Sequence, residues 1–236
     1  MNNLQRYTFI DALRGFALIN MILYHTLWDI NYIFGVKIAW YTSHIGYVWQ
    51  QMICITFIFV SGFCFPMGMH KLKRGLITLG CSAIISIVTA VFMPQSIILF
   101  GVLSLIGSSI VIMIPCERLL QKVNCYLGFV VFAIAFAVAK NFASYPQWLY
   151  ANMFTAYLGF PPTGFTSMDY FPLMPWIFLF VAGYFAHSIF KKHNLMPLLT
   201  KIKCTPLEWA GRHSLIIYMA HQPVIYAVLL AADMLI

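Results

Sequence analysis

Seven apolar segments, each about long enough to cross a lipid bilayer, constrain the fold of this chain more than any other feature. Of the 236 residues, 62% are hydrophobic and 8% are charged, whereas a soluble domain carries about 25% charged residues. The apolar runs are continuous rather than alternating, which favours helices over the strands of a barrel. We therefore predict one all-α integral membrane domain, residues 1–236, with about seven transmembrane helices. The segments cover approximately residues 10–31, 46–69, 74–93, 95–115, 123–140, 171–190 and 212–232.

The positive charges predict the orientation of these helices. If the N-terminus lies inside, all the lysines and arginines except Lys37 and Lys140 fall on the cytoplasmic side. This bias is typical of cytoplasmic loops and predicts an N-in, C-out topology. It also accounts for the net charge of +8, so no nucleic-acid partner is needed. The cytoplasmic set is Arg6, Arg14, Lys71, Lys73, Arg74, Arg118, Lys122, Lys191, Lys192, Lys201, Lys203 and Arg212.

The segments between the predicted spans give three further expectations. Only Met93-Pro94-Gln95 separates the third and fourth spans, which predicts an antiparallel hairpin. The outer loops at about 32–45 and 141–170 are long enough to be functional. Arg14 interrupts the first apolar run, so we expect it to remain as a helix rather than be removed as a signal peptide. The six cysteines form no CxxC pair and are interpreted as small hydrophobic residues, with no disulfide or metal.

The first span, Phe9 to Tyr32, carries ionisable residues that are costly inside a membrane. Arg14 and His25 are eleven residues apart, about three helical turns or roughly 16 Å along the axis, and therefore share one face. His25 and Asp29 are adjacent at i and i+4. This pattern suits a general base or nucleophile oriented by a carboxylate, with a phosphate-binding arginine below it. Both residues have plainer alternatives: Arg14 could snorkel to the cytoplasmic end of the membrane or pair with Asp11, and His25 could simply hydrogen-bond within the helix bundle.

The last span predicts further site residues. It opens with Gly211-Arg212-His213-Ser214, at about the level of Arg14. His221 follows nine residues after Arg212, roughly 13 Å deeper, which is close to the depth of His25. His221 and Gln222 either face the substrate or hydrogen-bond between helices, and Pro223 either opens the helix or kinks it for packing.

Two other positions carry competing interpretations. Asp169 precedes the sixth span at the predicted outer face, where it either contacts an acceptor or is merely solvated. Ser61-Gly62-Phe63 in the second span indicates close helix packing through a small residue.

Three motifs in this order resemble the membrane acyltransferase superfamily. They are IDALRGFALINMILYH with its R-x10-H spacing, FIFVSGF in the second span, and the terminal GRHSLIIYMAHQPV. The chain is most similar to small bacterial members of the heparan-α-glucosaminide N-acetyltransferase catalytic-domain family, with acyltransferase-3-like motifs. The resemblance covers the first two and the last two spans.

The resemblance implies acetyl-CoA, or another acyl-CoA, as a cytosolic donor and an extracytoplasmic acceptor. It implies a catalytic His25 and a coenzyme contact at Arg14. Two features depart from these relatives. Acyltransferase-3 proteins have about ten spans, and the lysosomal enzyme has Asn at the position of His25 and its proposed catalytic His in the following loop. His44 is the counterpart of that loop histidine here.

We therefore predict a membrane acyltransferase, in a bacterial inner membrane, that acts on a sugar or similar polar acceptor. The base is His25 or His44, transfer is direct or through an acyl-histidine, and Asp29 orients His25. Lys73, Arg74, Arg212, His213 and Ser214 join Arg14 at the coenzyme. Asp169, His221 and Gln222 contact the acceptor or the oxyanion. Lipid surrounds the chain, and a homo-oligomer is compatible with it.

Two other functions compete with this one. His25 and His221 lie at similar depth and could ligate a b-type haem in a redox protein. A transporter or lipid flippase could use His25 and Asp29 as a proton relay.

Overall fold

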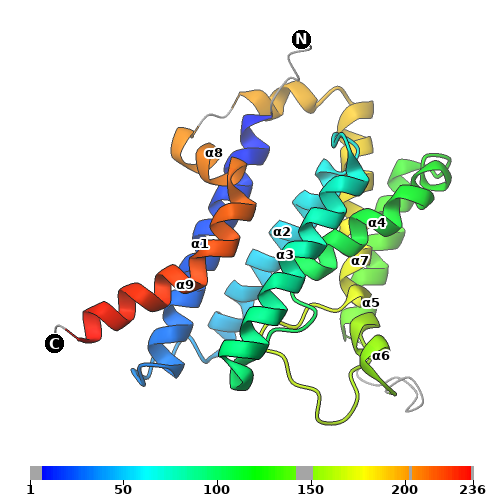
Figure 1. Ribbon diagram of the computed structural model, residues 1–236. Helices are drawn as coiled ribbons and strands as arrows, with labels where there is room; N and C mark the ends of the chain where they lie inside the picture. The colour runs from blue at the N-terminus through cyan, green and yellow to red at the C-terminus, as the bar shows by residue number, and fades with distance from the viewer. Residues whose placement is uncertain (1–6, 142–150, 202–203, 235–236) are drawn as a thin grey trace. The chain divides into compact units, whose positions relative to one another are not determined.

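The computed structural model describes residues 7–141, 151–201 and 204–234, and in these ranges all regular structure is helical. The chain forms two compact units, residues 1–57 with 194–236 and residues 58–193. Helix α2 begins in the first unit and ends in the second. In chain order (Figure 1) the helices are α1 (Thr8–Tyr32), α2 (His44–Cys64), α3 (Lys71–Phe92), η1 (Pro94–Ser96), α4 (Val102–Leu120), α5 (Cys125–Asn141), α6 (Met153–Leu158), α7 (Leu173–Lys192), η3 (Met196–Thr200), α8 (Thr205–Arg212) and α9 (Ser214–Asp233).

Each of the seven predicted segments overlaps one long helix, namely α1, α2, α3, α4, α5, α7 or α9. Five of these, α2, α3, α4, α7 and α9, are long and apolar enough to cross a membrane. Helix α5 is apolar but shorter, and α1 falls outside this set because its polar residues lower its hydropathy. The chain is therefore a helical integral membrane protein. The count of seven spans and the orientation, including the placement of Arg6 and Lys203 outside the described residues, stay predictions.

The connection between α3 and α4 is longer than the sequence indicated. The two helices pack side by side as a hairpin, but η1 and an extended stretch separate them, so α4 begins at Val102 rather than near residue 95. Pro94 ends α3, and the backbone that follows is held by other partners: Ile98 N donates to Thr89 Oγ1, and Leu99 N donates to Ser167 Oγ. An apolar run here forms a loop because its backbone groups are satisfied outside a helix.

Two short helices were not predicted. Helix α6 lies in the outer loop predicted at 141–170, of which residues 142–150 lie outside the described residues, and it begins with a capping box between Asn152 and Thr155. Helix α8 ends at Arg212 and α9 starts at Ser214, so the last span does not open at Arg212 as predicted. His213 lies between them with non-helical backbone angles.

In the first unit, α1 and α8 cross where two glycines meet. A Cβ atom on Gly15 would lie 1.9 Å from the carbonyl oxygen of Leu207, and one on Gly211 would lie 1.8 Å from that of Asp11. Such close backbone approach is typical of membrane helix pairs that use small residues. The crossing fixes α8 against α1 and so sets the position of the α8–α9 junction.

Replacing Gly15 by alanine should therefore destabilise the fold. The new methyl group meets a backbone carbonyl that cannot rotate away, and overpacking of this kind costs about 1–3 kcal/mol or more. The matched control is Gly80→Ala, since a Cβ on Gly80 of α3 has nothing within 4 Å and alanine favours a helix by about 1 kcal/mol. Thermal unfolding of the purified protein should show a lower Tm for the first variant only. Equal melting temperatures would contradict the close crossing.

Glycines also mark the helix crossings of the second unit. Gly62 of α2 approaches the Phe180 carbonyl of α7, where a Cβ would lie 1.9 Å from the oxygen, and Gly183 of α7 approaches Phe59 of α2. The prediction of close packing at Ser61-Gly62-Phe63 is thus confirmed. Gly75 and Gly107 make the same kind of contact between α3 and α4.

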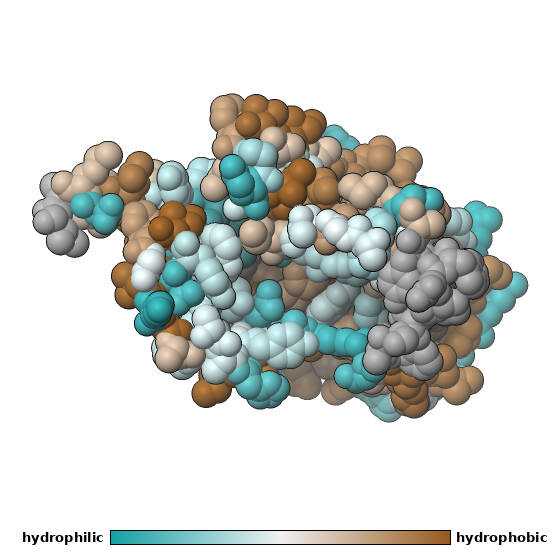
Figure 2. All heavy atoms as spheres, turned by 90° about the horizontal axis from the view of Figure 1, so that it is seen from below, coloured by the Kyte–Doolittle hydropathy of each residue, from teal (hydrophilic) through white to brown (hydrophobic). Residues whose placement is uncertain are grey.

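The surface has the polarity of a membrane protein. Figure 2 shows many exposed hydrophobic residues with polar residues among them. Helix α3 is an example, because Ile84, Ile87, Val91 and Phe92 are all more than half exposed. No disulfide joins the six cysteines, all of which lie in the described ranges, and only Cys64 is buried.

Candidate active site

Four of the predicted site residues come together in the first unit, between α1 and α9. The ring centroids of His25 and His221 lie 5.0 Å apart. One residue further along α9, Gln222 Nε2 donates to Asp29 Oδ1 at 2.7 Å. The expectation that His221 lies at the depth of His25 is confirmed by this contact. Two helices at opposite ends of the chain thus form one polar cluster of His25, Asp29, His221 and Gln222.

Asp29 is the most buried polar residue of this cluster. Its side chain is 0% exposed. Asp29 Oδ2 and Gln222 Oε1 are both buried and find no hydrogen-bond partner among the described residues. A buried polar atom without a protein partner is costly and is found mainly at functional sites or beside an ordered water. The expected contact of Asp29 with His25 is replaced by the bond to Gln222, because the carboxyl group reaches across to α9.

The hydrogen bond of His221 defines which of its nitrogens can react. Its Nδ1 donates to the carbonyl oxygen of Tyr218, one turn earlier in α9. A neutral ring with a proton on Nδ1 has its lone pair on Nε2. Neutral His221 therefore accepts at Nε2, whereas the Nε2 group of Gln222 has a second N–H besides the one that Asp29 accepts. Pro223 follows within α9, which continues past it to Asp233.

The haem alternative requires a different arrangement of the two histidines. A bis-histidine haem places its porphyrin plane between its two ligands. Here the two rings contact each other in a tilted arrangement, with centroids 5.0 Å apart and an interplanar angle of 55°. This contact leaves no room for a porphyrin between them.

Arg14 and Arg212 have different surroundings. Arg212 Nη2 donates to Glu208 Oε2 at 2.9 Å, and Arg212 Nε lies 3.7 Å from Asp11 Oδ2. The suggested pairing of Asp11 with Arg14 is therefore wrong, since α8 brings Arg212 to Asp11. Arg14 is half-buried and has no carboxylate partner among the described residues. Of the two, Arg14 is the one whose positive charge remains for an anionic ligand.

The other predicted residues of this unit lie at the ends of helices. His44 is exposed at the first position of α2. The ring of His213 packs on Trp209 with centroids 4.8 Å apart, and its Nδ1 donates to the Trp209 carbonyl oxygen. Ser214 is the first residue of α9.

Three predicted residues belong to the second unit. Lys73 and Arg74 are exposed in the first turn of α3. Asp169 Oδ2 accepts from the backbone N–H of Val102 at 3.5 Å, at the N-terminus of α4. A carboxylate there is stabilised by the helix dipole. Asp169 therefore has a structural contact with α4, whereas the sequence suggested either contact with an acceptor or simple solvation.

A cavity of about 220 Å³ lies beside the cluster, and most of its residues were missed in the sequence. Tyr24, Trp28 and Tyr32 are spaced four residues apart and therefore form a stripe on α1 next to that of His25 and Asp29. The rings of Tyr24 and His25 are 6.0 Å apart. The aromatic residues at positions i, i+4 and i+8 are the sequence signal that could have predicted this cavity. We call this space the aromatic cavity; it is lined by Tyr24, Trp28, Tyr32, Tyr41, Thr42, Ser43, Tyr47 and Gln50.

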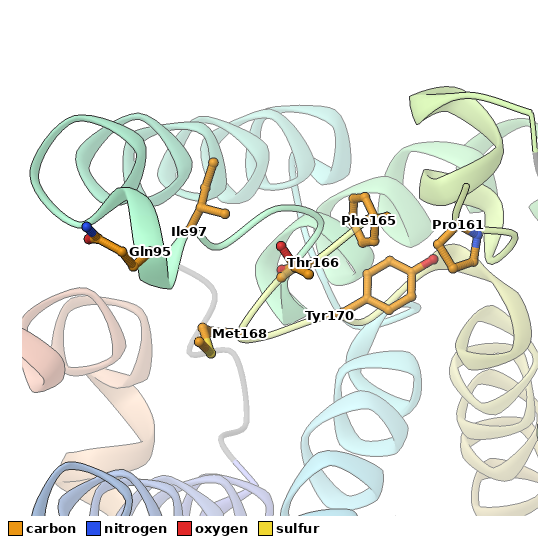
Figure 3. Close-up of a pocket in the computed structure, with 8 residues that line it drawn as sticks. Gln95, Ile97, Pro161, Phe165, Thr166, Met168 and Tyr170 are labelled. Atoms are coloured by element: carbon orange, nitrogen blue, oxygen red, sulfur yellow. The ribbon is translucent and has the colours of Figure 1, made fainter. Parts of the chain in front are cut away.

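A larger cavity, of about 400 Å³, lies in the second unit. Figure 3 shows Gln95 and Ile97 on one side of it and Phe165, Thr166, Met168 and Tyr170 on the other. The Tyr170 hydroxyl donates to the Ala156 carbonyl oxygen, and burial raises the pKa of Tyr170 to about 12. Its eight lining residues include no histidine, acid, lysine or arginine. The polar cluster of the first unit is therefore the stronger candidate for chemistry.

The fold and the cluster define a class: a polytopic helical membrane protein with two half-buried histidines beside a buried carboxyl group. Residues 6–223 match the family model described as heparan-alpha-glucosaminide N-acetyltransferase, catalytic. The chain belongs to this family, and the membership indicates acetyltransferase activity. No curated protein and no solved structure matches the chain significantly.

Proposed function

We propose that this protein transfers an acetyl group from cytosolic acetyl-CoA to a hydroxyl or amine of an extracytoplasmic sugar, across a bacterial inner membrane. The observation that carries the proposal is the contact of His25 and His221 beside the buried Asp29–Gln222 pair. A histidine in such a cluster can exchange a proton with a reacting group. Membership of an acetyltransferase family supports the same reaction.

In the proposed reaction His25 is the general base. It takes the proton of the acceptor O–H or N–H while the acceptor oxygen or nitrogen attacks the thioester carbonyl carbon. The negative charge on the carbonyl oxygen is stabilised by the second N–H of Gln222. The C–S bond then breaks, and His25 returns the proton to the coenzyme thiolate. Asp29, one turn from His25, stabilises the imidazolium that exists between these two steps.

Arg14 is the proposed contact for a coenzyme phosphate. Eleven residues place it about 16 Å along α1 from His25, so the phosphates and the reacting thioester can lie at opposite ends of one helix face. An arginine that no carboxylate neutralises among the described residues is suited to a phosphate, because its planar fork donates two hydrogen bonds.

Replacing Arg14 by alanine should raise the KM for acetyl-CoA by about 10- to 100-fold, the effect of losing a charged hydrogen bond. The melting temperature should change little, because Arg14 holds no ion pair in the described structure. Lys37→Ala, which removes an exposed cation from the 33–43 loop, is the matched control for charge. An unchanged KM in Arg14→Ala would contradict the assignment.

A vesicle experiment tests the reaction itself. Purified protein is reconstituted with acetyl-labelled acetyl-CoA on one side and glucosamine on the other. We expect labelled acetylglucosamine on the acceptor side, with the coenzyme retained on the donor side. Absence of labelled product, or passage of the coenzyme across the bilayer, would refute the proposal.

A further inference from the structure

The aromatic cavity is bounded by residues of very different exposure. Tyr41 is 4% exposed and lies at the bottom, while Tyr32 and Tyr47 are 58% and 51% exposed and lie at the rim. Ring contacts join the walls, because the Tyr24 and Tyr41 centroids are 4.9 Å apart and those of Trp28 and Tyr32 are 5.3 Å apart. The cavity lining therefore combines exposed rings with one buried phenol.

The loop that completes the cavity is held against α1. Ile38 N donates to Asn31 Oδ1 at 2.8 Å, and Val36 N donates to the Ile30 carbonyl oxygen at 3.0 Å. Thr42 and Ser43, which line the cavity, each donate a side-chain hydrogen bond to a carbonyl oxygen of the same loop. These bonds fix Tyr41 and its neighbours before any ligand arrives. A preformed site binds with a smaller loss of entropy than a mobile loop.

The chemistry of the lining is aromatic and hydrogen-bonding but contains no ionic side chain. Five of the eight residues are Tyr or Trp, and the other three are Thr, Ser and Gln. The buried Tyr41 hydroxyl lies within hydrogen-bonding reach of the Tyr24 hydroxyl. Burial raises the pKa of Tyr41, so the phenol keeps its proton and remains a hydrogen-bond donor. Its position next to the His25 stripe is suited to the acceptor rather than to the charged coenzyme.

We infer that the aromatic cavity binds a sugar ring that carries no sulfate, phosphate or carboxylate group. The inference rests on the proposed function and specifies its acceptor. Aromatic faces carry partial negative charge, which disfavours anions, whereas they pack well on the apolar C–H face of a sugar. An anionic group in this cavity would lose water without gaining a cationic partner from the lining, which is costly. Selection for a ring without anionic groups therefore follows from the lining.

Saccharide binding by the full chain, without any acetyl-CoA, tests this inference. The protein is held in lipid nanodiscs, because a detergent with a sugar headgroup would compete for the cavity. The probes are methyl glycosides of glucose, galactose, mannose and N-acetylglucosamine, each compared with its 6-sulfate, and methyl glucuronide. We expect at least one neutral glycoside to bind about tenfold or more tightly than its sulfate. Equal or tighter binding of the anionic probes, or no binding of any neutral glycoside, overturns the inference.

A matched pair of variants places the binding in the cavity. Tyr47→Ala removes a rim ring and should weaken the neutral glycoside by about 2- to 10-fold. Tyr226→Ala removes another partly exposed tyrosine, 39% exposed on α9 and outside the lining, and should leave binding unchanged. An equal effect of both variants would also overturn the inference. Glycoside binding without acetyl transfer would contradict only the proposed function, so the two failures are distinguishable.

Discussion

Replacing His25 by alanine should lower the rate of acetyl transfer from acetyl-CoA by about 10²–10⁴-fold, the usual contribution of a general base. The acceptor must lose a proton as it attacks, and His25 is the histidine of α1, one turn from the buried Asp29 and next to Tyr24 of the aromatic cavity. The measurement is transfer of labelled acetyl groups by purified protein at saturating donor. Binding of a neutral glycoside should persist, because His25 is not part of the cavity lining.

The control for this substitution is His193→Ala in the second unit. His193 is exposed and contacts Tyr126, so its loss should leave transfer unchanged. His44→Ala separates the two candidate bases that the sequence left open. Full activity in His25→Ala together with an inactive His44→Ala would move the base to the start of α2.

The long helices were predictable because hydrophobic length is a strong signal. The ranges 10–31 and 171–190 correspond closely to α1 and α7, since a helix in lipid must satisfy its backbone bonds internally. The error at 95–115 has a specific cause. Residues 97–100 are as apolar as a span, but tertiary hydrogen bonds to Thr89 and Ser167 hold them outside a helix.

The side-chain partners were less predictable than the helices. Helical spacing places His25 and Asp29 on one stripe, but it does not say which neighbouring helix supplies a partner. Gln222 reaches Asp29 across 193 positions of sequence, and that contact depends on how α9 packs against α1. The same holds for Arg212, which meets Asp11 only because Gly15 and Gly211 let α8 approach α1. Pairings of this kind follow from tertiary packing and not from local pattern.

Changing Asp29 to asparagine should separate the charge of this residue from its hydrogen bond. The amide oxygen of the new side chain can still accept from Gln222 Nε2, so the melting temperature should stay close to that of the wild type. The negative charge near the His25 imidazolium is lost, and we expect acetyl transfer to fall by about 10²–10³-fold, as for the loss of one preorganised electrostatic contact. Asp29→Leu is the contrasting variant: it also leaves the Gln222 N–H without its partner, which should lower stability by about 1–3 kcal/mol.

A double substitution determines whether Asp29 acts through His25. If the carboxylate works by positioning and stabilising the imidazole, Asp29→Asn should have almost no further effect on transfer in the His25→Ala background, because residues that act as a unit are not additive. A full additional loss in that background would assign Asp29 a separate role at the acceptor. Wild-type transfer by Asp29→Asn alone would instead make the Asp29–Gln222 contact a purely structural link between α1 and α9.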